Sequence, residues 1–224
     1  MEHYVIIFIA VIFVTVDTLY QYTNYNPLNG FGKDLIGFIP NWYGRLTGPF
    51  GDELIPGSYL SKLVFLGWLY LILKIKRKSY FFLYSILYLS IIGLTIFATG
   101  ERMALATYLM GLIFLFTFLK GKRIIILISL ISTLLLIFFT QKIHPIYNDY
   151  NIIESTPYHL GLKVEKEFYC ENNKNLKCKK IIKLQPELKE VLKKFNKSAY
   201  GEIYNLGISM YKDHKFFGVG LNNF

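Results

Sequence analysis

The sequence predicts an all-α polytopic membrane protein, with about five transmembrane helices followed by a polar C-terminal segment. Apolar residues make up 53% of the 224 positions, slightly more than the roughly 45–50% of an average soluble domain. They are gathered in blocks long enough to cross about 30 Å of hydrocarbon. Basic residues cluster in two short loops between the blocks, and polar residues collect after Thr140.

The expected membrane spans follow from the apolar blocks. They cover residues 4–20, 59–73, 80–98, 103–119 and 124–140. Together they define a transmembrane bundle over residues 1–140, and residues 141–224 form a second, polar region. The first span differs from a signal peptide because no Lys or Arg precedes it and no A-x-A-like site follows it.

The charges of the loops give the expected orientation. Four Lys or Arg lie at 74–78 and three at 120–123, but only two lie in the linker at 22–57 and one in the turn at 100–102. Positively charged loops stay in the cytoplasm. We therefore expect the N-terminus inside, and the linker, the turn and residues 141–224 outside. The net charge is +10, and the clustered basic residues between the apolar blocks are explained by membrane orientation. We expect no nucleic-acid partner, because nucleic-acid binding would need a soluble basic face.

The extracytoplasmic segment has the pattern of a small β-hairpin. Apolar and charged residues alternate from 162 to 171, residues 172–175 resemble a turn, and a second extended stretch runs through Ile182. Cys170 and Cys178 lie on the two arms, where a disulfide would persist outside the cytoplasm. The alternative is two unpaired thiols.

Two amphipathic helices are expected after the hairpin. Gln185-Pro186 opens the first, and the second begins near Ser198. Their apolar stripes favour a position on the membrane surface or against the bundle.

The chain carries no motif of a soluble enzyme. It has no P-loop, G-x-S-x-G, H-E-x-x-H or C-x-x-C, and its four histidines are scattered. We therefore expect neither a metal nor a cofactor.

Two charged turns on the predicted outer side are candidate sites. Glu101-Arg102 interrupts apolar sequence, and an arginine there suits a phosphate or pyrophosphate headgroup; the alternative is a topological turn in which Arg102 pairs with Glu101 or lipid. The loop from Arg45 to Asp52 and Glu53 offers a cation and two acids for acceptor or base roles, or is simply solvated. A third stretch, 213–220, has a G-x-G whose spacing favours helix termination.

These stretches resemble the bacterial O-antigen ligase and O-antigen polymerase family. Thr99–Ala104 resembles the S-G-E-R-x-A signature of the family. Asp17–Gln21 and Arg45–Leu60 resemble its preceding segments, and Lys212–Phe224 resembles its extracytoplasmic-loop motif.

The resemblance implies a metal-independent membrane glycosyltransferase of lipopolysaccharide biosynthesis in the bacterial cell envelope. Such an enzyme moves glycans from undecaprenyl diphosphate to a lipid-linked acceptor at the outer face of the cytoplasmic (inner) membrane. Its partners would be the lipid-linked donor, a glycolipid acceptor and membrane lipid. Arg102 matches the arginine expected to hold the donor diphosphate, and Glu101, Arg45, Asp52 and Glu53 are the other substrate-binding candidates. Ligase and polymerase share these motifs, so that choice stays open.

The chain departs from the family pattern at its C-terminal end. Family members are longer, and their loop motif is followed by a second arginine and a His-rich segment with the proposed catalytic base. We therefore expect the base beyond Phe224, and expect the chain to be the N-terminal part of a longer enzyme, inactive alone. His214 does not match the catalytic position. The alternative is a non-enzymatic polytopic protein, such as a transporter half or an assembly subunit; a transporter should have broken helices or midplane charges, which the predicted spans lack.

Overall fold

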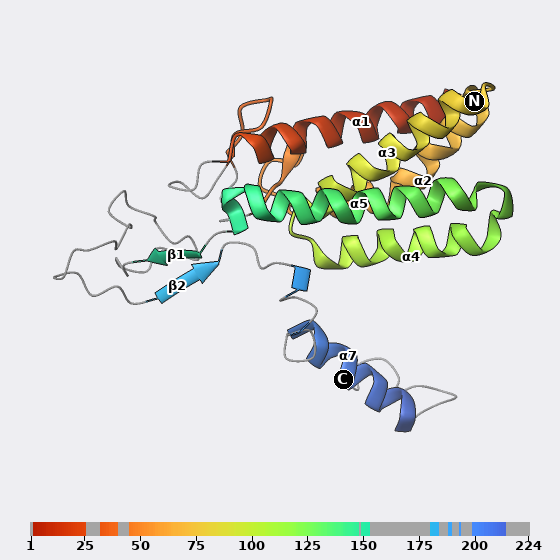
Figure 1. Cartoon of the computed structure of the whole chain (residues 1–224). Coiled ribbons are helices and arrows are strands. Elements are labelled where there is room, and N and C mark those ends of the chain that lie inside the picture. Colours follow the sequence, from red (N-terminus) through yellow and green to blue (C-terminus); the bar gives the residue numbers. More distant parts are fainter. Residues whose placement is uncertain are drawn as a thin grey trace. The chain divides into compact units, whose positions relative to one another are not determined.

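The structure is a computed structural model that describes residues 2–25, 32–39, 45–147, 149–152, 180–183, 188, 189, 193 and 199–213. Its main feature is a bundle of five long helices that run alternately in opposite directions (Figure 1). The helices are α1 (Glu2–Thr23), α2 (Pro56–Lys74), α3 (Lys78–Ala98), α4 (Arg102–Phe118) and α5 (Arg123–Ile143). Short 3-10 turns are η1 (Gly48–Phe50), η2 (Lys120–Lys122) and η3 (Pro145–Tyr147).

The predicted spans agree with these helices. Each lies within one helix, apart from Leu119, which follows the last residue of α4. Helices α1, α2, α3 and α5 are long and apolar enough to cross a membrane, whereas α4 is apolar but has 17 residues. The mostly helical fold with several apolar helices is thus confirmed, and the span assigned to α4 stays a prediction.

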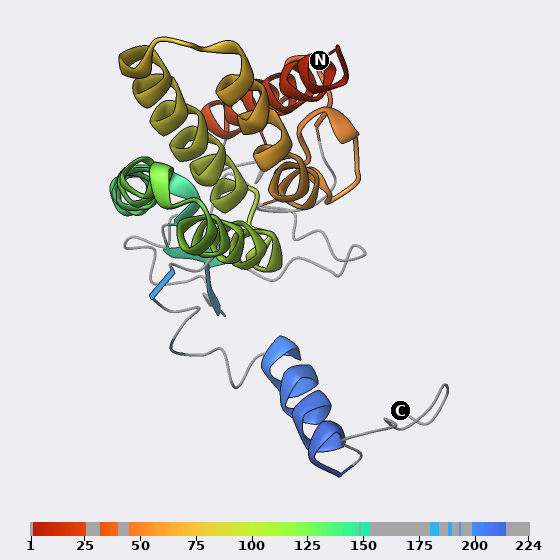
Figure 2. The same ribbon diagram turned by 90° about the vertical axis from the view of Figure 1, so that its right-hand side faces the viewer.

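Helix α3 occupies the centre of the bundle. It packs against α1, α2, α4 and α5, and Figure 2 shows it between α1 and α2 on one side and α4 and α5 on the other. Tyrosine hydroxyls join α3 to its neighbours: Tyr88 donates to the carbonyl of Val64 at 3.1 Å, and Tyr108 donates to that of Leu89 at 2.8 Å. In lipid, such polar contacts between helices contribute roughly 0.5–2 kcal/mol each.

Glycines allow these helices to approach closely. A Cβ on Gly67 would lie 2.0 Å from the Tyr88 hydroxyl, and one on Gly93 would lie 2.7 Å from a Thr133 methyl group. Both distances are shorter than the contacts that real Cβ atoms make, so a larger residue at either position would force its neighbours to shift. Small residues at such crossings are typical of membrane helix packing.

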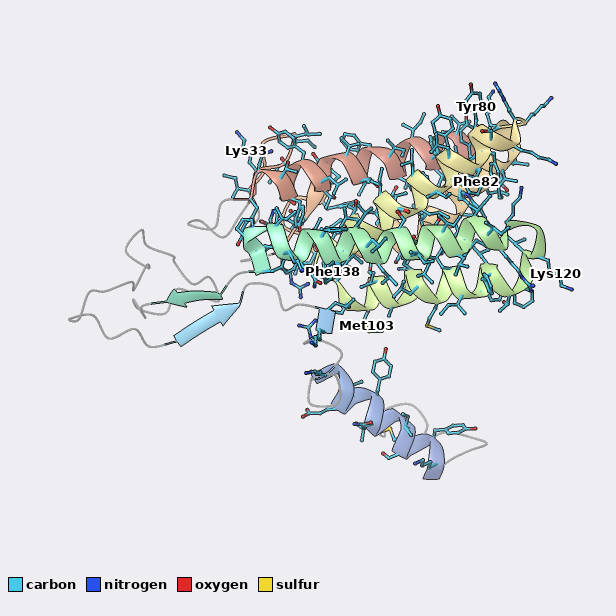
Figure 3. All side chains as sticks on the ribbon, in the orientation of Figure 1. Lys33, Tyr80, Phe82, Met103, Lys120 and Phe138 are labelled. Atoms are coloured by element: carbon cyan, nitrogen blue, oxygen red, sulfur yellow. The ribbon has the colours of Figure 1, made fainter. Side chains whose placement is uncertain are left out.

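The loops gather at two ends of the bundle, which we call the basic end and the turn end. The basic end holds the clusters at 74–78 and 120–123, and the Lys122 ammonium lies 4.2 Å from the centre of the Phe81 ring. The turn end holds residues 32–39, residues 45–55, the turn at 99–101 and the end of α5. Figure 3 labels Lys120 at the basic end and Lys33 at the turn end. The two basic clusters therefore lie at one end of the bundle, and the membrane topology stays a prediction.

Beyond the helices, two short strands pair. Strand β1 (Asp149–Ile152) runs antiparallel to β2 (Lys180–Lys183), with Tyr150 opposite Ile182. Strand β2 overlaps the second arm of the predicted hairpin, but its partner is residues 149–152, which were not predicted to pair with it. The first arm, 162–171, lies outside the described residues, so the predicted hairpin itself stays a prediction.

The chain divides into two compact units, residues 1–185 and 186–224. The second contains α7 (Ala199–Asp213), which lies at the predicted position of the second amphipathic helix. Its exposed apolar side chains include Ile203, Ile208 and Tyr211.

At the turn end, His144 links the end of α5 to the end of α1. Its ring stacks on Tyr22 with centroids 3.8 Å apart, and its Nε2 lies 2.7 Å from the Tyr22 carbonyl oxygen. A carbonyl only accepts, so Nε2 carries the proton, and Nδ1 accepts from the Ile146 N–H at 3.3 Å. The site therefore suits neutral histidine, and burial lowers the pKa of His144 from its ordinary 6.5.

We expect the stability of the bundle to fall in mild acid because of His144. The unfolded chain takes up the proton first, so the stabilisation is complete above pH 6.5 and is lost as the pH falls through the lower folded-state pKa. Thermal unfolding of the detergent-solubilised protein between pH 8 and pH 5 measures this loss. His144→Phe keeps the stacking but has no titrating ring, so its profile should be flatter; an unchanged slope would contradict the assignment.

Candidate substrate-binding site

The turn between α3 and α4 is short and tightly constrained. Gly100 has a φ of 76°, in the left-handed region that favours glycine. The Thr99 hydroxyl donates to the Ile96 carbonyl at 2.7 Å and accepts from the Glu101 N–H at 3.3 Å. The turn therefore has one defined shape, and α4 begins immediately after it at Arg102.

Glu101 holds this turn against the start of α2. Its Oε1 accepts from the Gly57 N–H at 2.8 Å and its Oε2 from the Ser58 N–H at 2.9 Å. The first amides of a helix have no partner within the helix, and its N-terminus favours negative charge. Glu101 thus caps α2 from a distant part of the sequence.

Gly57 is shaped to receive this cap. A Cβ there would lie 2.6 Å from the Thr99 hydroxyl and 3.0 Å from the Glu101 carboxyl carbon. The residue is buried, so the surrounding groups have little room to move. Only glycine lets the turn approach α2 this closely.

We therefore expect Gly57→Ala to destabilise the bundle by about 1–3 kcal/mol, the usual cost of overpacking. Thermal unfolding of the variant in detergent measures the loss. Gly121→Ala is the matched control, because a Cβ at Gly121 meets nothing within 4 Å. Equal melting temperatures for the two variants would show that the turn is looser than described.

Arg45 holds the turn from another direction. Its Nη1 donates to the carbonyl of Gly100. Next to it, Thr47 and Gly48 both donate their N–H groups to Oε1 of the buried Gln21 on α1, each at 2.9 Å. The segment 45–48 is therefore fixed to α1 on one side and to the turn on the other.

Arg102 is exposed at the first position of α4. In the part of the chain that the structure describes, its guanidinium makes no hydrogen bond or ion pair, because the neighbouring carboxylate of Glu101 is directed to α2. Glu101 also makes no side-chain cap on α4. Arg102 therefore adds its positive charge at the N-terminus of α4, which is the positive end of the helix dipole. Such an N-terminus attracts anions.

The other predicted site residues lie at the same end or outside the described chain. Asp52 and Glu53 are exposed in the loop that leads into α2. Cys170 and Cys178 lie outside the described residues, as does the stretch after Asp213, so the disulfide and the loop motif stay predictions. Among the described residues, no group of three or more His, Cys, Asp or Glu side chains lies close enough together to hold a metal ion.

Comparison of the sequence with models of protein families gives a match that includes this turn. The family model described as O-Antigen ligase matches residues 86–224, more than half of the chain. The chain belongs to the O-antigen ligase family. No curated protein and no solved structure matched it. Its family and its apolar helices make it a multi-pass bacterial membrane protein. The O-antigen ligase family consists of membrane glycosyltransferases, and their substrates are in general lipid-linked glycans.

One feature of this O-antigen ligase family member is not anticipated from its sequence. Asp17, Thr18 and Gln21 are fully buried on α1, and Asp34 is 2% exposed. The spacing of Asp17 and Gln21, four residues apart, does indicate a polar face on this helix. What the sequence alone does not provide is the partner segment that covers this face.

Proposed function

We propose that the protein is a glycosyltransferase of O-antigen ligase or polymerase type. It transfers a glycan from an undecaprenyl-diphosphate donor to a lipid-linked acceptor, with the turn end at the outer face of the cytoplasmic membrane. The positive-inside rule supports this orientation, since the basic end carries seven Lys or Arg in its two clusters.

The unpaired guanidinium of Arg102 carries the proposal. It lies within the segment matched by the family, on a turn held by Glu101 and Arg45. During transfer, the leaving diphosphate develops negative charge at the oxygen that is released. A preorganised, bidentate cation stabilises that charge without reorganising at the moment of reaction.

The remaining candidates have supporting roles in this proposal. Glu101 and Arg45 act on the substrate by fixing the turn that presents Arg102. Asp52 and Glu53 are exposed carboxylates at the same end, and in this proposal they accept hydrogen bonds from the hydroxyls of a sugar acceptor.

The test is glycan transfer by the complete gene product in nanodiscs, supplied with a lipid-diphosphate-linked glycan and a glycolipid acceptor, with EDTA present. We expect a glycosylated acceptor and released lipid diphosphate. Movement of the intact donor across the bilayer without transfer would instead support a transporter.

A further inference from the structure

Three of the buried oxygen atoms at the turn end that have no hydrogen-bond partner lie where loop segments cover α1. They are Oδ2 of Asp17, Oγ1 of Thr18 and Oδ2 of Asp34. Asp17 and Thr18 have no exposed surface, and Asp34 is 2% exposed. Buried polar atoms are normally satisfied, so three unsatisfied oxygens on neighbouring segments require an explanation.

The three atoms belong to one cluster, formed where two loop segments cover α1. A Cβ added to Gly48 would lie 2.4 Å from the Thr18 hydroxyl and 3.7 Å from Asp17 Oδ2, so Gly48 packs closely against both oxygens. Asp17 Oδ1 accepts from the N–H of Leu35 at 2.9 Å, which brings Asp34 beside it.

The other oxygen of each carboxylate is already engaged in a way that fixes its position. Asp34 Oδ1 accepts from the N–H groups of Gly37 and Phe38, each at 2.6 Å. These bonds shape residues 32–39 and leave both Oδ2 atoms in the interior. Hydrogen bonds to the Oδ1 atoms thus fix the orientation of both carboxylates, as second-shell hydrogen bonds do for metal ligands.

The charge of this cluster is uncompensated among the described residues. No lysine or arginine there forms an ion pair with Asp17 or Asp34, and the nearby Lys33 is exposed. An ionised carboxylate in a buried site is costly, and two near each other are more so. A cation bound by the pair, or a proton shared by it, would remove this cost.

We propose that Asp17, Asp34 and Thr18 bind a divalent cation of the calcium type. Two carboxylates neutralise two positive charges, and the donor set consists only of oxygen, which hard cations prefer. Main-chain carbonyls and water would complete the shell of six to eight oxygens that Ca²⁺ takes. The ion would fasten residues 32–39 to α1, and we assign it no part in the transfer chemistry.

The test is thermal unfolding of the full chain in detergent, after EDTA treatment and then with increasing Ca²⁺, alongside equilibrium binding of radioactive ⁴⁵Ca²⁺. We expect a saturable rise in melting temperature of several degrees, with a dissociation constant on the order of 10⁻⁴ M, typical of extracellular calcium sites. Asp34→Asn keeps an oxygen for Gly37 and Phe38 but loses the charge, so it should lose both the rise and the binding. Glu202→Gln, at an exposed carboxylate of α7, should retain both.

Two binding results would overturn the proposal. One is the absence of ⁴⁵Ca²⁺ binding by the wild-type protein, which requires no variant to fold. The other is binding that Asp34→Asn and Thr18→Val leave unchanged. Stability that increases on acidification, is insensitive to Ca²⁺ and is reproduced by Asp17→Asn would show a shared proton in place of the cation.

Discussion

Replacing Arg102 with alanine should reduce glycan transfer by roughly 10²–10³-fold, the usual effect of removing one preorganised stabilising group from an active site. The fold should be unaffected, because the side chain is exposed and no described residue pairs with it. The loss should appear mainly in kcat, since the charge on the leaving diphosphate develops during the reaction. Initial rates at saturating donor, with melting temperature measured in parallel, check both parts.

Arg102→Lys sharpens this prediction. Lysine keeps the charge but lacks the planar fork that binds two phosphate oxygens at once, so its rate should fall between those of the wild type and the alanine variant. Lys33→Ala removes another exposed cation from the turn end and is the matched control. Equal losses in Lys33→Ala and Arg102→Ala would indicate a general effect of surface charge, and an active Arg102→Ala would remove Arg102 from donor binding.

The sequence predicted the helices well because their signal is local. Apolar runs of membrane length mark each span, and the charged clusters at 74–78 and 120–123 mark their ends. The turn at Glu101-Arg102 was equally visible, as the break in a long apolar stretch. These features depend on neighbours in the chain, which is the information that a single sequence contains.

The roles of the two charges in the turn depended on contacts between distant residues. Glu101 and Arg102 are adjacent, and sequence alone left open whether they pair with each other. In the structure Glu101 binds amides 44 and 43 residues away, at Gly57 and Ser58, which leaves Arg102 exposed. The same holds for Gln21, whose partners at Thr47 and Gly48 are 26 and 27 residues away. No periodicity or motif specifies such pairings.

Replacing Glu101 with alanine should destabilise the bundle and also reduce transfer. Two α2 amides would lose their charged acceptor, which should cost about 1–3 kcal/mol of the free energy of unfolding. The turn would also lose its attachment to α2, and a displacement of about 1 Å at a reacting group can lower a rate by about 10²-fold. Glu101→Gln keeps one acceptor oxygen and the length of the side chain, so both losses should be smaller.

A double variant separates positioning from direct participation in the reaction. If Glu101 acts only by placing Arg102, then Glu101→Ala combined with Arg102→Ala should transfer no more slowly than Arg102→Ala alone, because the group being placed is already absent. If Glu101 contacts the substrate itself, the two losses should multiply, and Glu101→Gln should be as slow as Glu101→Ala without a comparable drop in melting temperature. The geometry favours the first outcome, since both oxygens of the carboxylate are bound to α2.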